Sequence, residues 1–333
     1  MMKSTISSFE ERIRSKNWKH VHIDGGYWEK FEFMNGKYTI HGDDCLAVSE
    51  NLTEWNVIKI DAITQWHYLK FINGKYIISN EHQIAYSEDL NSWNVSVIDS
   101  EKAKENGTID WKCIAYANGK YFMHRYDKIA YSDDLNTWSV EKINIQGHID
   151  LFSLRVKFVN DKFIIHGNNI LAHSDNINEW IVVDVGIKDF WRQFEFLNNK
   201  YIATSNERLI YSEDLINWTI VELCNRECWE SIHYLNGKYI LVGGFQIAYS
   251  KDLIDWVIIG TNSFDECEEL QFIDGVYVLK STGYVHYSYN LKCWHAVKIH
   301  TTEDFDCWRA FKYIDGKYIT FGESGLMYCD VHN

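Results

Sequence analysis

Three histidines could bind a metal, because they occupy equivalent positions in different copies of a sequence repeat. Each of them ends a short apolar run: His41, His124 and His166. Histidines that converge from several elements can hold a transition metal. The alternative is a repeated structural histidine bonded to backbone. We favour the second interpretation and expect no metal and no cofactor.

Acidic and basic side chains could support hydrolysis or anion binding. Glu230 and Glu268 are candidates for an acid or base, and Arg192 and Arg309 each follow a Trp in the same way. Glycoside hydrolysis needs two carboxyl groups about 5 to 9.5 Å apart. Carboxyl groups are too frequent here to select a pair. The chain has no nucleophile elbow, phosphate-binding loop or dinucleotide fingerprint.

Six tryptophans stand at one equivalent position and are candidates for stacking on a ligand: Trp28, Trp66, Trp111, Trp191, Trp229 and Trp308. Tryptophan rings around a channel mouth could bind sugars, aromatic groups or a cation. The alternative, which repetition favours, is that each ring packs against the neighbouring repeat.

The elements that position these residues come from a repeat of about 40 residues, which is typical of a four-stranded propeller blade. With small variations, a copy has an apolar strand, an Asn-Gly-type turn, Lys-Tyr, a second strand, and then Tyr-Ser-x-Asp-Leu-x-x-Trp. The closing tryptophans are Trp55, Trp93, Trp138, Trp180, Trp218, Trp256 and Trp294. In the copy 66–98 we predict strands A to D at 66–71, 75–80, 84–88 and 93–98. Asn73-Gly74 should form the A–B hairpin turn.

The last copy is split between the two ends of the chain. Residues 308–333 supply three strands and then stop, while residues 17–23 have the pattern of the missing fourth strand. We therefore predict an all-β fold: an eight-bladed β-propeller of four-stranded antiparallel blades, the last blade completed by the N-terminal strand. Residues 1–17 should form a helical extension, with Phe9 and Ile13 on one face, and residues 18–333 a single propeller domain.

The Ser-x-Asp-x-x-x-Trp turns resemble those of the Asp-box (BNR-repeat), sialidase-like propellers. The matching residues include Ser87, Asp89 and Trp93, and also Ser212, Asp214 and Trp218. The family's Gly two residues after the Asp is absent, and Asn replaces Asp at Asn51, Asn176 and Asn290. The resemblance implies the propeller architecture and carries over no activity.

Strand A should be the innermost strand of each blade. Its fourth and sixth residues, such as Phe31 and Phe33, are apolar and should pack between blades. Its third and fifth residues, such as Arg155 and Lys157, are mostly polar and should line a wet central channel. The alternative is that these polar rows pair with one another for structure alone. The variable D–A and B–C loops share one end of the blades, where we expect function.

The net charge of −14, without a basic stripe, argues against nucleic acid. No apolar run is long enough for a membrane span, and residues 1–19 have no apolar core, so we expect a cytoplasmic protein. We predict a monomeric binding module whose D–A/B–C loop face and Trp-rimmed channel bind a protein, peptide or glycan. The alternative is an enzyme of glycosidase, lyase or peptide-modifying type with its active site at the same channel mouth.

Overall fold

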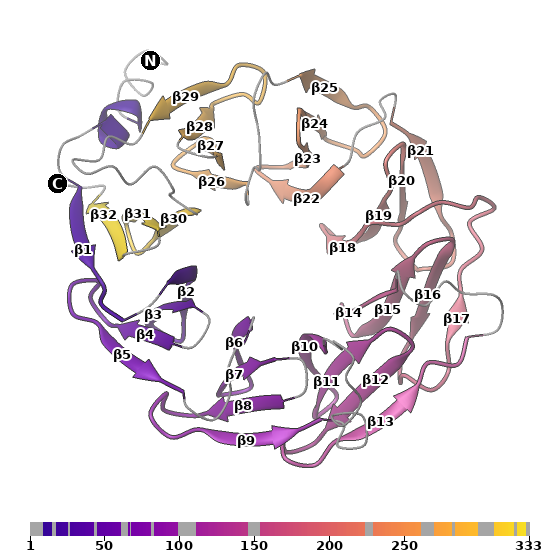
Figure 1. Ribbon diagram of the computed structural model, residues 1–333. Helices are drawn as coiled ribbons and strands as arrows, with labels where there is room; N and C mark the ends of the chain where they lie inside the picture. Colours follow the sequence, from indigo (N-terminus) through magenta and orange to yellow (C-terminus); the bar gives the residue numbers. More distant parts are fainter. Residues whose placement is uncertain are drawn as a thin grey trace. The chain divides into compact units, whose positions relative to one another are not determined.

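The chain is an all-β protein with the fold of an eight-bladed β-propeller, and each blade is a four-stranded antiparallel sheet (Figure 1). The computed structural model describes residues 9–14, 18–25, 27–42, 45–60, 66, 68–80, 83–98, 111–145, 154–223, 229–260, 270–281, 284–298, 310–322 and 325–330. The predicted fold class is confirmed. The chain forms two compact units, Ile60–Ile232 and Met1–Lys59 with His233–Asn333, and the single domain of residues 18–333 stays a prediction.

The unit Ile60–Ile232 contains blades 2 to 5. Blade 2 consists of β6 (Tyr68–Ile72), β7 (Lys75–Ser79), β8 (Gln83–Ser87) and β9 (Asn94–Val97). Blade 3 consists of β10 (Lys112–Ala117), β11 (Lys120–Arg125), β12 (Lys128–Ser132) and β13 (Ser139–Lys142). Blade 4 consists of β14 (Arg155–Val159), β15 (Lys162–Gly167), β16 (Ile170–Ser174) and β17 (Ile181–Val182). Blade 5 consists of β18 (Gln193–Leu197), β19 (Lys200–Thr204), β20 (Arg208–Ser212) and β21 (Thr219–Glu222).

The other unit contains blades 7, 8 and 1 and most of blade 6, and the boundary falls inside β22. Blade 6 consists of β22 (Trp229–Leu235), β23 (Lys238–Gly243), β24 (Gln246–Ser250) and β25 (Val257–Gly260). Blade 7 consists of β26 (Gln271–Ile273), β27 (Val276–Ser281), β28 (Tyr284–Ser288) and β29 (His295–Lys298). Blade 8 consists of β30 (Ala310–Ile314), β31 (Lys317–Gly322), β32 (Gly325–Asp330) and β1 (Lys19–His22). Blade 1 consists of β2 (Trp28–Met34), β3 (Lys37–Gly42), β4 (Cys45–Ser49) and β5 (Asn56–Lys59).

Blade 8 is completed by the N-terminal strand, as predicted. β1 pairs antiparallel with β32 in the register Val21↔Leu326, and the two strands lie side by side in Figure 1. Residues 9–14 form a helical turn before this strand, and the extension of residues 1–17 as a whole stays a prediction. The remainder of that extension, residues 1–8 and 15–17, lies outside the described residues.

Local turn chemistry explains why the blades recur. Asn73 and Gly74 have φ values of 49° and 77°, as a two-residue hairpin turn of this kind requires. At the C–D turn, Ser87 Oγ accepts the N–H of Leu90, and Asp89 Oδ1 accepts two backbone N–H groups further along. Trp93 Nε1 then donates to the Leu90 carbonyl at 3.1 Å, so the indole fixes the turn. These bonds hold the buried Leu90 at a φ of 69°, which a residue of this type seldom adopts.

Within each unit, the core lies between the facing sides of neighbouring blades. The fourth residue of strand A is buried in every blade, as Phe31 and Phe194 illustrate. The sixth residue is partly exposed instead. Phe33, for example, is 36% exposed and contacts Tyr38 of its own hairpin, with ring centroids 4.7 Å apart. Among the described helices, none is long and apolar enough to cross a membrane.

Candidate functional site

The tryptophan row lies in the core. Its five described members are 0–3% exposed: Trp28, Trp66, Trp111, Trp191 and Trp229. Trp308 lies outside the described residues. A ring without an exposed face has nothing to stack on a ligand, so their burial supports the packing interpretation.

The strand register explains why the tryptophan row does not share the exposed face of the polar third and fifth residues of strand A. Trp66, Trp111 and Trp191 precede the first paired residue of their strands. In blade 1 the pairing register shifts between Trp28 and Lys30. Alternation of faces holds only along a regular ladder, so residues before it or across a bulge can turn to the other face.

The three equivalent histidines are also buried. His166 is fully buried and its Nδ1 contacts the Trp191 carbonyl at 2.9 Å, while its Nε2 has no hydrogen-bond partner. Burial lowers the pKa of His166 to about 3 and that of His41 to about 4. Among the described residues, no three His, Cys, Asp or Glu side chains are grouped as metal ligands.

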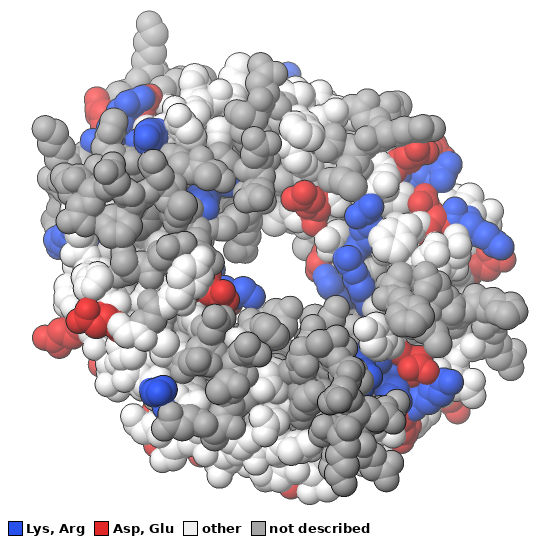
Figure 2. All heavy atoms as spheres, viewed as in Figure 1, with Lys and Arg blue, Asp and Glu red and all other residues white. Residues whose placement is uncertain are grey.

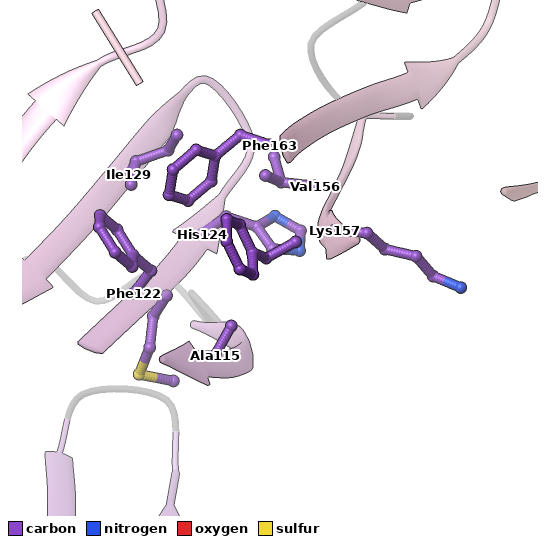
Figure 3. Close-up of a pocket in the computed structure, with 9 residues that line it drawn as sticks. Ala115, Phe122, His124, Ile129, Val156, Lys157 and Phe163 are labelled. Atoms are coloured by element: carbon purple, nitrogen blue, oxygen red, sulfur yellow. The ribbon is translucent and has the colours of Figure 1, made fainter. Parts of the chain in front are cut away.

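His124 borders a small cavity between blades 3 and 4 (Figure 3). The cavity has a volume of about 20 Å³, which has room for about one water molecule. Its walls are mostly apolar, with Phe122, Val156 and Phe163 around the imidazole, and the Lys157 side chain extends away from it. A cavity of this size does not admit a substrate.

The polar residues of the inner strands bond to the neighbouring blade. Strand A has no ladder partner on its inner side, so its carbonyl groups need other donors. The fifth residue of one blade supplies them. Lys70 Nζ donates to Ile114 O at 3.4 Å, and Lys157 Nζ donates to Phe194 O at 3.1 Å.

Blade 7 repeats this contact, because Gln271 Nε2 donates to Phe311 O at 2.7 Å. Lys157 also forms an ion pair with Glu195 at 2.5 Å. These contacts support the structural interpretation for this part of the polar rows.

Two arginines at the D–A end of blades 4 and 5 differ from these polar residues because no described carboxylate pairs with them. We call them the arginine pair: Arg155 and Arg192. Arg155 is exposed, and its Nη1 donates to the backbone carbonyl of Arg192 at 2.5 Å. The Arg192 guanidinium carbon lies 5.3 Å from the ring centroid of Phe190, and its Nε has no hydrogen-bond partner. Among the described residues no carboxylate forms an ion pair with either arginine.

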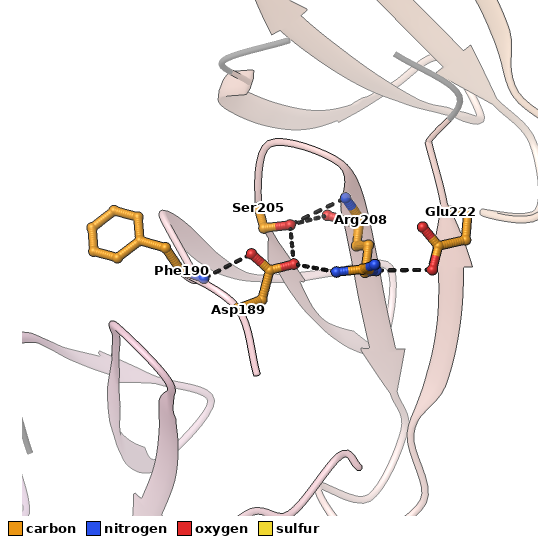
Figure 4. Close-up of polar contacts among 5 residues, drawn as sticks. All are labelled: Asp189, Phe190, Ser205, Arg208 and Glu222. Atoms are coloured by element: carbon orange, nitrogen blue, oxygen red, sulfur yellow. Dashed lines mark hydrogen bonds and ion pairs between the residues drawn. The ribbon is translucent and has the colours of Figure 1, made fainter. Parts of the chain in front are cut away.

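The D–A loop that carries Arg192 is held by a polar cluster in blade 5 (Figure 4). Asp189 accepts hydrogen bonds from Ser205 Oγ at 2.8 Å and from Arg208 Nη1 at 3.1 Å, and it also caps the N–H of Phe190. Arg208 Nε donates to Glu222 at 2.8 Å. The Arg192 N–H donates to Thr204 O at 2.8 Å. These bonds fix the backbone beneath the arginine pair.

Figure 2 shows Lys and Arg side chains gathered over the inner ends of β14 and β18, with acidic side chains beside them. The positive charges of Lys157 and Arg155 also affect the buried His166. Burial is the main cause of its lowered pKa, and both charges lower it further. A local excess of positive charge in a chain of net charge −14 favours an anionic ligand.

The remaining predicted site residues lie as follows. Glu230 is exposed on β22, and its carbonyl accepts the Gln193 amide at 2.7 Å. Glu268 and Arg309 lie outside the described residues. The structure therefore places Arg192 just before β18 and Glu230 on the neighbouring inner strand β22, and it adds Arg155, which the sequence assigned to the polar rows.

No model of a known protein family matches the chain, and no curated protein sequence matches it. Solved structures do resemble it. The computationally designed Ika8 protein has a TM-score of 0.64 at 9% identity, covering 93% of this chain and 98% of its own. BamB from Moraxella catarrhalis has a TM-score of 0.64 at 7% identity, covering 93% and 97%.

Virginiamycin B lyase from Staphylococcus aureus has a TM-score of 0.56 at 9% identity, covering 79% of this chain and 95% of its own. At such low identities these likenesses show the fold alone. The Asp-box resemblance stays a prediction, because no family model supports it.

Proposed function

We propose that this protein is a non-enzymatic binding module that holds an acidic segment of a partner protein or peptide at the D–A/B–C end of blades 4 and 5. The arginine pair carries the proposal. Arg155, on β14, and Arg192, at the end of the D–A loop that Asp189 fixes, present guanidinium groups without a described carboxylate partner. Guanidinium groups match carboxylates in geometry and in charge.

Binding ranks ahead of catalysis for two physical reasons. The histidines with lowered pKa are sealed in the core, where no substrate reaches them. The cavity beside His124 has room for about one water molecule. The tryptophan row plays no part in this proposal because its described members are buried. A cytoplasmic monomer is part of the proposal, and cell fractionation and sedimentation would test it.

The test uses a fluorescein-labelled pentaglutamate peptide, with pentalysine of the same length as the control ligand, and fluorescence anisotropy as the readout. The wild-type protein should bind the acidic peptide and lose affinity with added salt. The double variant Arg155→Gln/Arg192→Gln should weaken binding about tenfold or more, because each charge-assisted hydrogen bond contributes about 1.5 kcal/mol or more. Lys251→Gln, at the exposed C–D turn of blade 6, is the matched control and should change nothing.

Glu230→Gln separates the proposal from the enzyme alternative. Removing this exposed carboxylate from the neighbouring inner strand should strengthen binding of an acidic peptide. A catalytic Glu230 would instead show itself as a loss of turnover. Equal binding of pentaglutamate by the double variant, or equal binding of pentalysine by the wild type, would refute the proposal.

A further inference from the structure

The joint between blades 7 and 8 is occupied by the N-terminal helical turn of residues 9–14, drawn in indigo in Figure 1. Phe9 contacts Tyr287 of β28 and Tyr318 of β31, with ring centroids 5.1 and 5.7 Å apart. Ile13 is fully buried in the same cluster. A helix of one and a half turns is not stable in isolation, so these contacts hold it in place.

Blade 7 departs from the repeat at the position that makes room for Phe9. Other copies have Lys at this step, and in blades 2, 3, 5 and 6 that Lys lies over the tyrosine of strand C; Lys75, for example, is 5.3 Å from the Tyr86 ring centroid. Blade 7 has Val276 instead, and Val276 is buried in the cluster that contains Phe9. A Lys at this position would place its ammonium group against the ring that Phe9 covers.

The joint also lacks a hydrogen bond that other joints have. In several other joints the tyrosine of this step bonds to the A–B turn of the preceding blade. Asn160 Nδ2 donates to the Tyr201 hydroxyl at 2.7 Å, and the Tyr38 hydroxyl donates to Asp315 at 2.9 Å. In the joint of blades 7 and 8 the equivalent residues are Asp274 and Tyr318.

Here Asp274 pairs with Arg12 of the helical turn at 3.3 Å, and the buried Tyr318 hydroxyl has no hydrogen-bond partner in the part of the chain that the structure describes. Asp274 is nevertheless near, because its charge contributes to the raised pKa of Tyr318, after burial. A buried hydroxyl without a partner is unfavourable. When residues 9–14 dock, this joint therefore lacks the hydrogen bond between the Tyr318 hydroxyl and Asp274.

We infer that residues 9–14 are a reversible clasp over an aromatic docking groove formed by Val276, Tyr287 and Tyr318. When the clasp opens, Asp274 exchanges Arg12 for the Tyr318 hydroxyl, and the joint adopts the arrangement of its neighbours. The open groove fits a short helical segment with an aromatic residue and, three residues later, an arginine, as in Phe9 and Arg12. The inference does not rest on the proposed acidic-peptide site.

Hydrogen exchange on the full chain, followed by mass spectrometry over residues 9–14, measures this opening. Tyr318→Phe removes a hydroxyl that forms its hydrogen bond to Asp274 only when the clasp is open. The variant should therefore favour the closed clasp. The variant should raise the protection of residues 9–14 from hydrogen exchange about fivefold, because one ordinary hydrogen bond contributes about 1 kcal/mol. Val276→Lys restores the repeat residue and should lower that protection at least about tenfold through eviction of Phe9.

Tyr201→Phe is the matched control, because its joint has no clasp. It should weaken its own joint and leave exchange at residues 9–14 unchanged. Unchanged or lowered protection in Tyr318→Phe would overturn the inference, and so would unchanged protection in a folded Val276→Lys protein.

Discussion

Two buried histidines, His41 and His166, make the fold sensitive to mild acid. Burial is the main cause of their low pKa values, about 4 and about 3, and the nearby positive charges of Lys30, Lys157 and Arg155 act in the same direction. The unfolded value is near 6.5, so between these limits the unfolded chain binds more protons than the folded one. Their contribution is fully present above pH 6.5 and is lost as the pH falls toward the folded pKa.

The magnitude follows from the linkage relation. Each histidine contributes a slope of about 1.4 kcal/mol per pH unit in this window, which gives a loss of about 2 kcal/mol per histidine between pH 7 and pH 5. The pair together should lower the free energy of unfolding by about 4 kcal/mol, a large part of the roughly 5 to 15 kcal/mol typical of folded proteins. Asp214 and similar turn carboxylates, whose pKa is lowered by backbone hydrogen bonds, titrate below this window.

Urea denaturation at pH 5, 6 and 7 and constant ionic strength measures this effect. His166→Gln keeps an N–H donor for the Trp191 carbonyl but does not titrate, so about half of the pH dependence should disappear. His41→Gln/His166→Gln should remove most of it. A wild-type protein whose stability is flat from pH 7 to pH 5, or a double variant with the wild-type slope, would refute the argument from burial.

Gly325→Ala should lower the free energy of unfolding by more than about 1 kcal/mol, measured in urea, because its Cβ would lie 2.2 Å from the backbone oxygen of Val21 on the closing strand. Asp214→Ala should lower the urea midpoint, while Asp214→Asn should stay near the wild type, because Asn accepts the same N–H groups in other copies. Lys157→Met should lower the free energy of unfolding by about 1 kcal/mol, because a carbonyl of the next inner strand loses its donor. Lys312→Met, at the equivalent position of blade 8, should be nearly neutral.

The features that could be predicted from the sequence are those decided within a few residues. Asn73-Gly74 specifies its hairpin because both residues tolerate positive φ. Trp93 follows Asp89 at the distance that lets its indole reach back to the turn. The split blade was also predictable, because a strand pattern at one end matches a missing strand at the other, and the pairing Val21↔Leu326 confirms it.

The candidate site was less predictable, because it depends on contacts between blades. The sequence left the histidine row open to a metal or a structural role, and the burial of His41, His124 and His166 supports the structural role that we favoured. The sequence did not single out Arg155, because the feature that sets it apart is its hydrogen bond to the next blade. The sequence shows Val276 where other copies have Lys. Only the structure shows that Val276 packs in the same cluster as Phe9.

The inner polar rows separate into groups that hold the fold and groups that retain binding capacity. Lys70 and Gln271 bond to backbone carbonyls of the next blade, and Lys157 adds an ion pair. An arginine has five N–H donors. Arg155 uses one on a described partner, and the buried Nε of Arg192 has no hydrogen-bond partner among the described residues. In an acidic protein these donors would be the first to be neutralised if structure were their purpose, so their availability is the strongest reason to expect an anionic ligand at this end of blades 4 and 5.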